Sequence, residues 1–426
     1  MALLLLLILL GIVGGITVQF FMRGAAIRRI ETLDERDGAL EAGSDHFCLT
    51  FERLTDTRLS PDNEIEILTN GDGTFPRLLE DLRSARRLIT WQVYWFKPGR
   101  LAERVREVLE ERARAGVRVY CLFDYFGSHG LPAAYRDSLR EAGVHVGTFR
   151  PLEWKSLYKV QQRSHVRSVV IDGRIGYTGG FGIDDNWSGG GRRPGEWRDT
   201  NVRLVGMTVD QLQAAFVVNW AESSGELLVG DPLFAVDRED RRGNRDAGIV
   251  YTDPGLGSTR AERLFVLSIA AARRRLYITS AYFIPTRGLR RLLVDAVARG
   301  VDVRVLNPGA NTDQVVTWYA ARAHYRELIE GGVRIYEYEP TMIHAKTLVV
   351  DEIWCALGTI NFDNRSIVLN DEAVLLARDR EVGTKLHDLF LEDLQYAREV
   401  SLEAFGARGW GSKLKERAAR TISPFL

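Results

Sequence analysis

Cysteine is scarce in this chain of 426 residues, and its spacing argues against two common ways of stabilising a fold. The three cysteines, Cys48, Cys121 and Cys355, are far apart and odd in number, and no CxxC or Cys/His spacing occurs. A disulfide framework needs paired cysteines, and a structural zinc site needs clustered ligands. The sequence therefore predicts neither of these, and we expect no metal site and no cofactor.

Net charge is absent as well, since 57 lysines and arginines balance 57 aspartates and glutamates. Proteins that bind nucleic acid non-specifically usually carry a basic surplus, because their affinity comes from neutralising phosphates. The balance argues against a nucleic-acid partner, although a local basic groove would escape this test. The length suffices for two domains or for one domain with two lobes.

The first 22 residues carry no charged side chain, and residues 3–10 are all leucine or isoleucine. About 20 apolar residues span the bilayer core as a helix. The alternative, a cleaved signal peptide, needs a basic start and small residues at the cleavage site, where this chain has bulky residues 19–22. We predict a transmembrane anchor at residues 1–23 and a polar linker at 24–46. The arginines that follow the apolar segment predict a cytoplasmic location for the rest of the chain.

After the linker, the chain repeats a series of patterns. Two aromatic-rich strand patterns (residues 88–96 and 276–283) are each followed by a helical pattern (101–115 and 289–298), a glycine and a valine-rich strand pattern. A second helix and strand follow in each copy. The alternation predicts an α/β fold with parallel strands. Because the matched features come in matched order, we predict two repeats, at residues 47–230 and 231–400.

A histidine motif occupies the same place in each repeat. The second copy, H-x-K-x4-D-x6-G-[ST]-x-N, comprises His344, Lys346, Asp351, Gly358, Thr359 and Asn361. The first copy comprises His165, Arg167, Asp172, Gly179 and Gly180, with Gly182 where the second copy has asparagine. Both runs are expected to form strands, on which residues i and i+2 share a face, so each histidine lies beside a cation. A phosphodiester reaction needs a nucleophile, a proton donor and positive charge on the phosphoryl oxygens, and two such pairs supply all three.

These paired motifs resemble the HKD motifs of the phospholipase D superfamily, and residues 344–366 resemble the cardiolipin synthase version. The resemblance implies two pseudo-symmetric α/β repeats with a shared active site, attached to a bacterial inner membrane. It also implies phosphatidylglycerol as substrate and phosphatidyl transfer through a phosphohistidine, with His165 as nucleophile and His344 as general acid and then base. Spacing alone gives only phosphodiester chemistry.

The other motif residues are expected to support this chemistry. Lys346, Arg167 and Asn361 would hold the phosphoryl oxygens, whereas Asp172 and Asp351 would brace the site rather than touch substrate. Arg167 keeps the positive charge of the usual lysine, although it is bulkier. The amide that Gly182 lacks could be replaced by backbone N–H groups of the Gly179–Gly180 loop.

Two acids are each expected to open the next strand of their repeat, Asp199 in the first repeat and Glu372 in the second. In the family, an acid at the position of Glu372 hydrogen-bonds a catalytic histidine, and the sequence allows it to orient either imidazole. For Asp199 this role and that of an ordinary surface acid are equally open. The candidate substrate-binding residues are Gly179, Gly180, Gly358, Thr359, Ser366 and Asp199.

Basic and bulky apolar residues alternate in the C-terminal segment, residues 401–426, as in a helix that lies on an anionic membrane. A solvated tail is equally consistent with this pattern. Three other functions stay open: a hydrolytic phospholipase D, a membrane-tethered phosphodiesterase or nuclease, and an inactive lipid-binding scaffold. The sequence separates neither transferase from hydrolase nor one oligomeric state from another.

Overall fold

The structure is a computed structural model that describes residues 26–31, 40–152, 161–234, 243–254 and 258–423, together with positions 14 and 33. The predicted anchor at residues 1–23 lies outside the described residues, except for Gly14. Within the described part of the chain, no helix is both long and apolar enough to cross a membrane.

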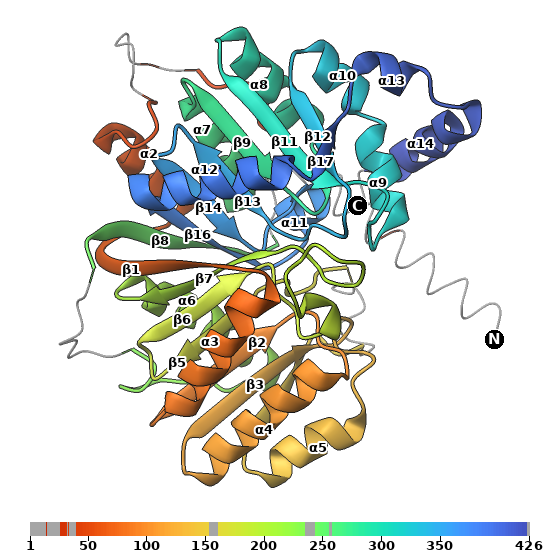
Figure 1. The fold of residues 1–426 in the computed structure, drawn as a ribbon. Coiled ribbons are helices and arrows are strands. Elements are labelled where there is room, and N and C mark those ends of the chain that lie inside the picture. Colours follow the sequence, from red (N-terminus) through yellow and green to blue (C-terminus); the bar gives the residue numbers. More distant parts are fainter. Residues whose placement is uncertain are drawn as a thin grey trace.

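Two halves of one 15-stranded sheet share the same strand order (Figure 1). From the centre outwards, the first half runs β1-β7-β6-β5-β2-β3-β4, and the second runs β8-β16-β14-β13-β9-β11-β12, with β17 at its outer edge. The central strands β1 and β8 pair antiparallel and join the halves. The predicted α/β fold is confirmed, whereas the repeat boundaries at residues 47, 230 and 400 stay predictions.

The strands of the first half, in chain order, are β1 (Ser60–Thr69), β2 (Leu88–Val93), β3 (Arg118–Asp124), β4 (His145–Phe149), β5 (Ser168–Ile171), β6 (Ile175–Gly179) and β7 (Thr200–Val205). Those of the second half are β8 (Arg245–Thr252), β9 (Arg275–Thr279), β11 (Asp302–Pro308), β12 (Arg334–Tyr338), β13 (Thr347–Val350), β14 (Trp354–Gly358), β16 (Glu372–Arg378) and β17 (Ala397–Glu399). A separate parallel pair joins β10 (Phe283–Ile284) to β15 (Phe362–Asp363).

The sheet is mixed rather than parallel throughout. Parallel pairing joins β2, β3 and β4 in one half and β9, β11 and β12 in the other. The strands within the histidine motifs, β5 and β13, instead form tight hairpins with β6 and β14. A hairpin reverses the chain within a few residues, so these strands run antiparallel to their neighbours.

Helices cover both faces of the sheet. In the first half they are α3 (Asn70–Ser84), α4 (Arg100–Arg114), α5 (Ala133–Glu141) and α6 (Thr208–Ser224), with a short 3₁₀ helix at Asp185–Trp187. In the second half they are α7 (Arg260–Ala271), α8 (Arg287–Ala298), α9 (Val315–Arg322), α10 (Tyr325–Glu330), α11 (Asn364–Val368) and α12 (Arg380–Leu394). The C-terminal segment adds α13 (Leu402–Gly406) and α14 (Trp410–Ile422).

Glycines follow α4 and α8, where the sequence predicts that each helix stops. Gly116 and Gly300 have φ angles of 89° and 90°, in the left-handed region that favours glycine. The next residue in each case donates its N–H back into the last helical turn, from Val117 to Arg112 and from Val301 to Ala296. This closes the helix and turns the chain into the next strand.

Two details of the sequence comparison differ from the structure. The first strand pattern is predicted to begin at residue 88 and the second at residue 276, but Ile89 is the structural counterpart of Leu276, since Ile89 pairs with Ile171 and Leu276 with the equivalent Val350. In addition, α2 (Asp45–Thr55), most of which the predicted boundary assigns to the first repeat, packs on the second half. Its Phe47 and Phe51 rings lie 5.0 and 4.7 Å from the Trp354 ring.

Candidate active site

The two histidine motifs meet at a pocket of about 270 Å³ between the halves. His165 and Arg167 reach it from the first half, and His344 and Asn361 from the second. The remaining lining residues are Tyr94, Trp95, Arg163, Trp187, Trp197, Tyr282, Asp313, Gln314, Thr317, Asp363, Arg365, Ser366 and Asn370. Residues 179 positions apart in the sequence thus share one site.

Both histidines lie just before the strands that they were expected to begin. Strand β5 starts at Ser168 and β13 at Thr347. The preceding residues pair with the opposite half instead: the backbone N–H of His165 donates to the carbonyl of Asp371 at 2.8 Å, and that of His344 to the carbonyl of Arg198 at 2.7 Å. Contacts between the halves therefore fix the backbone of each histidine.

Each histidine also faces an acid from the opposite half. Nδ1 of His165 lies 2.9 and 3.1 Å from the carboxylate oxygens of Glu372. Nδ1 of His344 lies 2.9 Å from the carbonyl oxygen of Gly180 and 3.3 Å from the carboxylate of Asp199. An acceptor at Nδ1 holds the proton there and leaves Nε2 for chemistry. Both acids are fully buried, so neither is a surface acid.

Burial sets the charge state of the two rings. It lowers the pKa of His165 well below the ordinary value, and Arg167 and Lys346 lower it further. Burial and then Lys346 lower the pKa of His344 to about 3. Both imidazoles are therefore neutral. A bound phosphodiester anion would raise the pKa of both rings, because it favours their charged forms.

The two acids behave differently. Burial raises the pKa of Glu372 to about 7, although Thr359 and Arg167 act against it. Burial acts in the same direction on Asp199, but its hydrogen bond and charge interaction with His344 hold the pKa of that carboxyl below its usual value. Asp199 also accepts hydrogen bonds from the Trp187 indole at 2.7 Å and from the Thr200 backbone at 2.8 Å. Asp199 is thus the more firmly ionised partner.

The two cations make matching contacts with the carbonyl oxygens of their own histidines, although Arg167 lines the pocket and Lys346 is not among its lining residues. Lys346 Nζ donates to the carbonyl oxygen of His344 at 2.6 Å and lies within 3.0 Å of both ring nitrogens. The Arg167 guanidinium donates to the carbonyl oxygen of His165 at 3.0 Å and to that of Phe181 at 2.7 Å. Both side chains are buried, and burial lowers the pKa of Lys346 to about 7. Within the described residues, no group of three or more His, Cys, Asp or Glu side chains could hold a metal ion.

The Asn361 position differs between the halves for a steric reason. Oδ1 of Asn361 is buried and has no hydrogen-bond partner among the described residues, so it is available to a ligand in the pocket. A Cβ on Gly182 would lie 3.0 Å from the Trp187 ring and from Trp95 Cβ. Trp187 therefore fills the space that an asparagine side chain would need.

The motif aspartates lie away from the pocket and hold neighbouring strands. The carboxylate of Asp172 accepts the backbone N–H groups of residues 86–88 at 2.8–2.9 Å. That of Asp351 accepts those of residues 273–275 at 2.7–2.8 Å. Each acid holds the start of the strand next to its own motif strand.

The expected substrate-binding residues fall into two groups. Ser366 lines the pocket. The others lie behind the histidines and hold them: Gly180 through its carbonyl, Asp199 through its carboxylate, and Thr359 by donating its hydroxyl to Glu372. Gly179 and Gly358 allow the backbones to approach, because a Cβ on either would meet backbone atoms at 2.7 and 2.4 Å. These positions differ from the expectation that all six residues touch substrate.

Aromatic and basic side chains that the sequence did not single out complete the wall. The Tyr94 ring lies 5.1 Å from that of His165, and the Trp187 and Trp197 rings lie 5.1 and 5.4 Å from that of His344. Arg163 and Arg365 add positive charge. Trp187 and Trp197, which follow the first motif in the sequence, were the one sequence feature that could have indicated this aromatic wall.

Comparison with known proteins identifies relatives of this chain. A family model described as "Cardiolipin synthase, PLD-like domain" matches residues 266–394. Over 366 residues the chain is 36% identical to cardiolipin synthase A of Pseudomonas fluorescens, a match that covers 85% of this chain and 75% of that protein. The chain belongs to the cardiolipin synthase family. Another member, the major cardiolipin synthase of Bacillus subtilis, is 34% identical over 367 residues, which cover 86% of this chain and 76% of that one.

A solved structure shares the fold of this cardiolipin synthase family member. Phosphatidylserine synthase from Haemophilus influenzae superposes with a TM-score of 0.67 at 15% identity, over 89% of this chain and 100% of that one. At this identity the likeness speaks for the fold alone.

Proposed function

We propose that the protein is a cardiolipin synthase, which transfers a phosphatidyl group from one phosphatidylglycerol to another. The observation that carries this proposal is the pair of neutral histidines at one pocket, each with a buried acid at Nδ1 and a buried cation beside it. Membership of the family supplies the substrate class, and the residue arrangement supplies the chemistry.

In the first step, Nε2 of His165 attacks the phosphorus of phosphatidylglycerol. The bond between phosphorus and the glycerol oxygen breaks, and a protonated His344 gives its proton to that oxygen, so glycerol leaves. Arg167, Lys346 and Asn361 stabilise the phosphoryl oxygens. Glu372 holds the Nδ1 proton of His165 and stabilises the positive charge that the ring gains.

In the second step, a glycerol hydroxyl of another phosphatidylglycerol attacks the phosphohistidine. His344 takes the hydroxyl proton, the bond between phosphorus and nitrogen breaks, and cardiolipin forms. If water took the place of this hydroxyl, the product would be phosphatidic acid. Nothing in the catalytic groups favours the lipid hydroxyl over water, so the product distinguishes the two functions.

The test is to incubate the purified protein with labelled phosphatidylglycerol and separate the lipids. Labelled cardiolipin together with free glycerol is expected, and the His165→Asn variant serves as the inactive control. Phosphatidic acid as the main product would replace the synthase with a hydrolytic phospholipase D. Absence of both products in conditions where the protein is folded would favour the scaffold.

We also propose that the protein works on the inner membrane, held by the N-terminal segment and by helix α14. Trp410 and Leu414 of α14 are exposed, as are Lys413 and Arg417 on the same side of the helix. The opposite side carries Ala419 in the core, and Lys415 lies 5.5 Å from the Tyr319 ring of α9. Since the α9 segment also lines the pocket through Thr317, this helix would bring the pocket close to the bilayer.

Vesicle binding tests the role of α14. Protein lacking residues 1–25 should sediment with vesicles of phosphatidylglycerol, and a Trp410→Ser, Leu414→Ser variant should sediment less. Equal sedimentation of the two proteins would leave α14 as a solvated helix. A reporter fused at the C-terminus should behave as cytoplasmic, and alkaline phosphatase activity from that fusion would place the domain outside.

A further inference from the structure

Each histidine is held at two points by two consecutive residues of the opposite half. For His165, the backbone carbonyl of Asp371 accepts the histidine N–H, and the carboxylate of Glu372 faces Nδ1. For His344, the carbonyl of Arg198 and the carboxylate of Asp199 do the same. We call these pairs the 371–372 clamp and the 198–199 clamp. Backbone N–H groups run the other way too, from Asp371 to Arg163 and from Arg198 to Met342.

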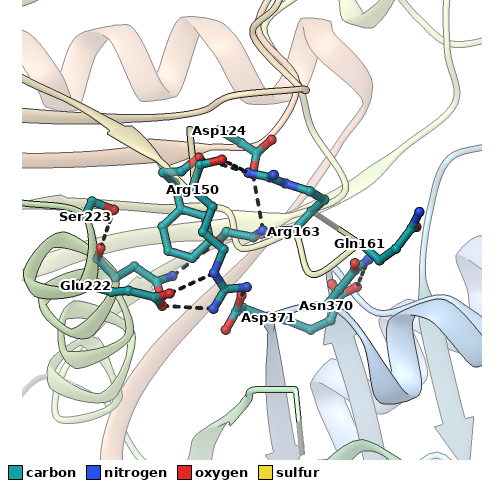
Figure 2. Close-up of polar contacts among 12 residues, drawn as sticks. Asp124, Arg150, Gln161, Arg163, Glu222, Ser223, Asn370 and Asp371 are labelled. Carbon is teal, nitrogen blue, oxygen red and sulfur yellow. Dashed lines mark hydrogen bonds and ion pairs between the residues drawn. The ribbon is translucent and has the colours of Figure 1, made fainter. Parts of the chain in front are cut away.

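The side chain of Asp371 is tied to the first half through Arg150 (Figure 2). Its carboxylate accepts from the Arg150 guanidinium at 3.0 Å and from the Tyr251 hydroxyl at 3.2 Å. Figure 2 shows that Arg150 reaches Asp371 and Glu222 at once, and it forms two further bonds of 2.9 Å with Glu222 on α6. Arg150 has a φ of 45°, a conformation that is costly for a residue other than glycine and that persists where surrounding contacts impose it.

The side chain of Arg198 is anchored in the opposite direction. Its guanidinium forms two bonds with the Asp393 carboxylate of α12, at 2.8 and 2.7 Å. It also donates to the Thr200 hydroxyl at 2.9 Å. Both ion pairs cross from one half to the other, but the acid comes from the second half in each, so the clamp residue is the acid in one case and the base in the other.

These ion pairs are buried and are therefore not solvent-exposed surface salt bridges. Asp371, Arg198 and Asp393 are each exposed by 3% or less. Removing the arginine of either pair leaves a buried carboxylate without its charge partner, which costs far more than the pair itself contributes. Neither pair touches the pocket, so a direct role with substrate does not explain them.

We propose that Asp371 and Arg198 are positioning residues. Each holds its own clamp in place, so that the orientation of one histidine depends on one clamp and that of the other histidine on the other clamp. The 371–372 clamp sets His165, and the 198–199 clamp sets His344. Displacing a reacting group by about 1 Å can cost about a hundredfold in rate. Which reaction step slows when a clamp is disturbed therefore depends on the roles proposed above for the two histidines.

Two substrates separate the clamps. A p-nitrophenyl phosphodiester has a leaving group that needs no protonation, whereas phosphatidylglycerol needs the proton of His344. Asp371→Asn should slow formation of the phosphohistidine from both substrates by about 10- to 100-fold, with KM within about twofold. Arg198→Gln should slow the reaction of phosphatidylglycerol by a similar factor and leave that of the p-nitrophenyl substrate nearly unchanged.

The chain offers a matched control in Asp81, which forms a buried ion pair with Arg203 at 2.6 Å within the first half alone. Asp81→Asn should lower the unfolding temperature without altering the ratio of the two rates. If Asp371→Asn or Arg198→Gln fails to fold, Tyr251→Phe and Asp393→Asn probe the same two clamps. Tyr251→Phe removes one hydrogen bond from Asp371, so it should slow the same reactions as Asp371→Asn but by a smaller factor.

Nitrogen NMR of protein labelled at histidine reports the environment of each imidazole ring and does not require catalysis. Asp371→Asn should shift the ring signals of His165 and not those of His344, and Arg198→Gln should do the reverse. These NMR shifts are expected even if the wild-type protein forms no covalent adduct. The absence of an adduct would count against the proposed function and not against the clamps. Rate signatures exchanged between the two variants would support the clamps and reverse the histidine roles. Variants that match Asp81→Asn, or that disturb both histidines equally, would overturn the proposal.

Discussion

The two halves of the molecule have the same strand order but different catalytic sets. The second half contributes His344 with Lys346 and Asn361, and the first contributes His165 with Arg167 and Gly182. The histidines and the contacts that cross the interface match, whereas the cation and the asparagine position differ. The geometry that brings two imidazoles to one pocket is thus kept in both halves, and Trp187 occupies the space of an asparagine in only one.

Replacing each histidine should give the largest difference between the halves. His165→Asn removes the nucleophile, so no covalent adduct should form and turnover should fall by at least about a thousandfold. His344→Asn removes the acid, yet it should still accumulate adduct from a p-nitrophenyl phosphodiester, because that leaving group needs no proton. Denaturing mass spectrometry measures the adduct. An adduct mapped to His344 in the His165→Asn protein would exchange the two roles.

Removing the first-half cation should have the next largest effect. Arg167→Ala should raise the barrier by about 2–4 kcal/mol, because a charge-assisted contact to a transition-state oxygen is lost. Arg167→Lys keeps the charge and restores the residue of the second half, so it should retain much of the activity. Single-turnover rates provide the measurement. Equal rates for Arg167→Ala and wild type would mean that only the second-half cation is used.

The pH profile should separate the two cations. Burial lowers the pKa of Lys346 to about 7, so its charge is present below that pH and lost above it, and activity should fall on the alkaline side. Lys346→Arg should move this limb to higher pH, since a guanidinium stays protonated. The acid limb should stay in place, because it reflects Glu372, whose pKa burial raises to about 7 and which no longer offers a negative charge to the His165 ring when protonated. An alkaline limb that does not move in Lys346→Arg would assign it to another group.

The asparagine position should tolerate change in a different way in each half. Gly182→Ala places a methyl group 3.0 Å from Trp187 and Trp95, so we expect a loss of about 1–3 kcal/mol in the free energy of unfolding. Asn361→Ala creates no such close contact, so it should lower activity with little change in the free energy of unfolding. Denaturant unfolding measures both variants. Unchanged stability in Gly182→Ala would show that the Trp187 ring moves aside freely.

Chelation should have the smallest effect. Lys346 and Arg167 supply the positive charge that a metal ion would otherwise place on the phosphoryl oxygens. Activity should therefore survive EDTA at a concentration that strips zinc and magnesium from a control metalloenzyme. A loss that zinc or magnesium specifically restores would contradict the assignment of this role to the two cations.

The sequence by itself determined the local elements and the type of chemistry. Alternating apolar residues predicted the strands, Gly116 and Gly300 marked the helix ends, and the spacing of His344, Lys346 and Asp351 indicated phosphodiester chemistry. These features depend on residues close together in the chain, whose patterns follow from helix and strand geometry.

Only the tertiary structure decided which acid serves which histidine. Glu372 lies 207 residues from His165, and Asp199 lies 145 residues from His344, and the sequence left both assignments open. The Trp187 ring that excludes an asparagine at position 182, and the ion pairs of Asp371 and Arg198, likewise escaped sequence analysis. The physical reason is that packing of one half against the other creates all these contacts, and no periodic pattern along the chain records which side chains will meet across that interface.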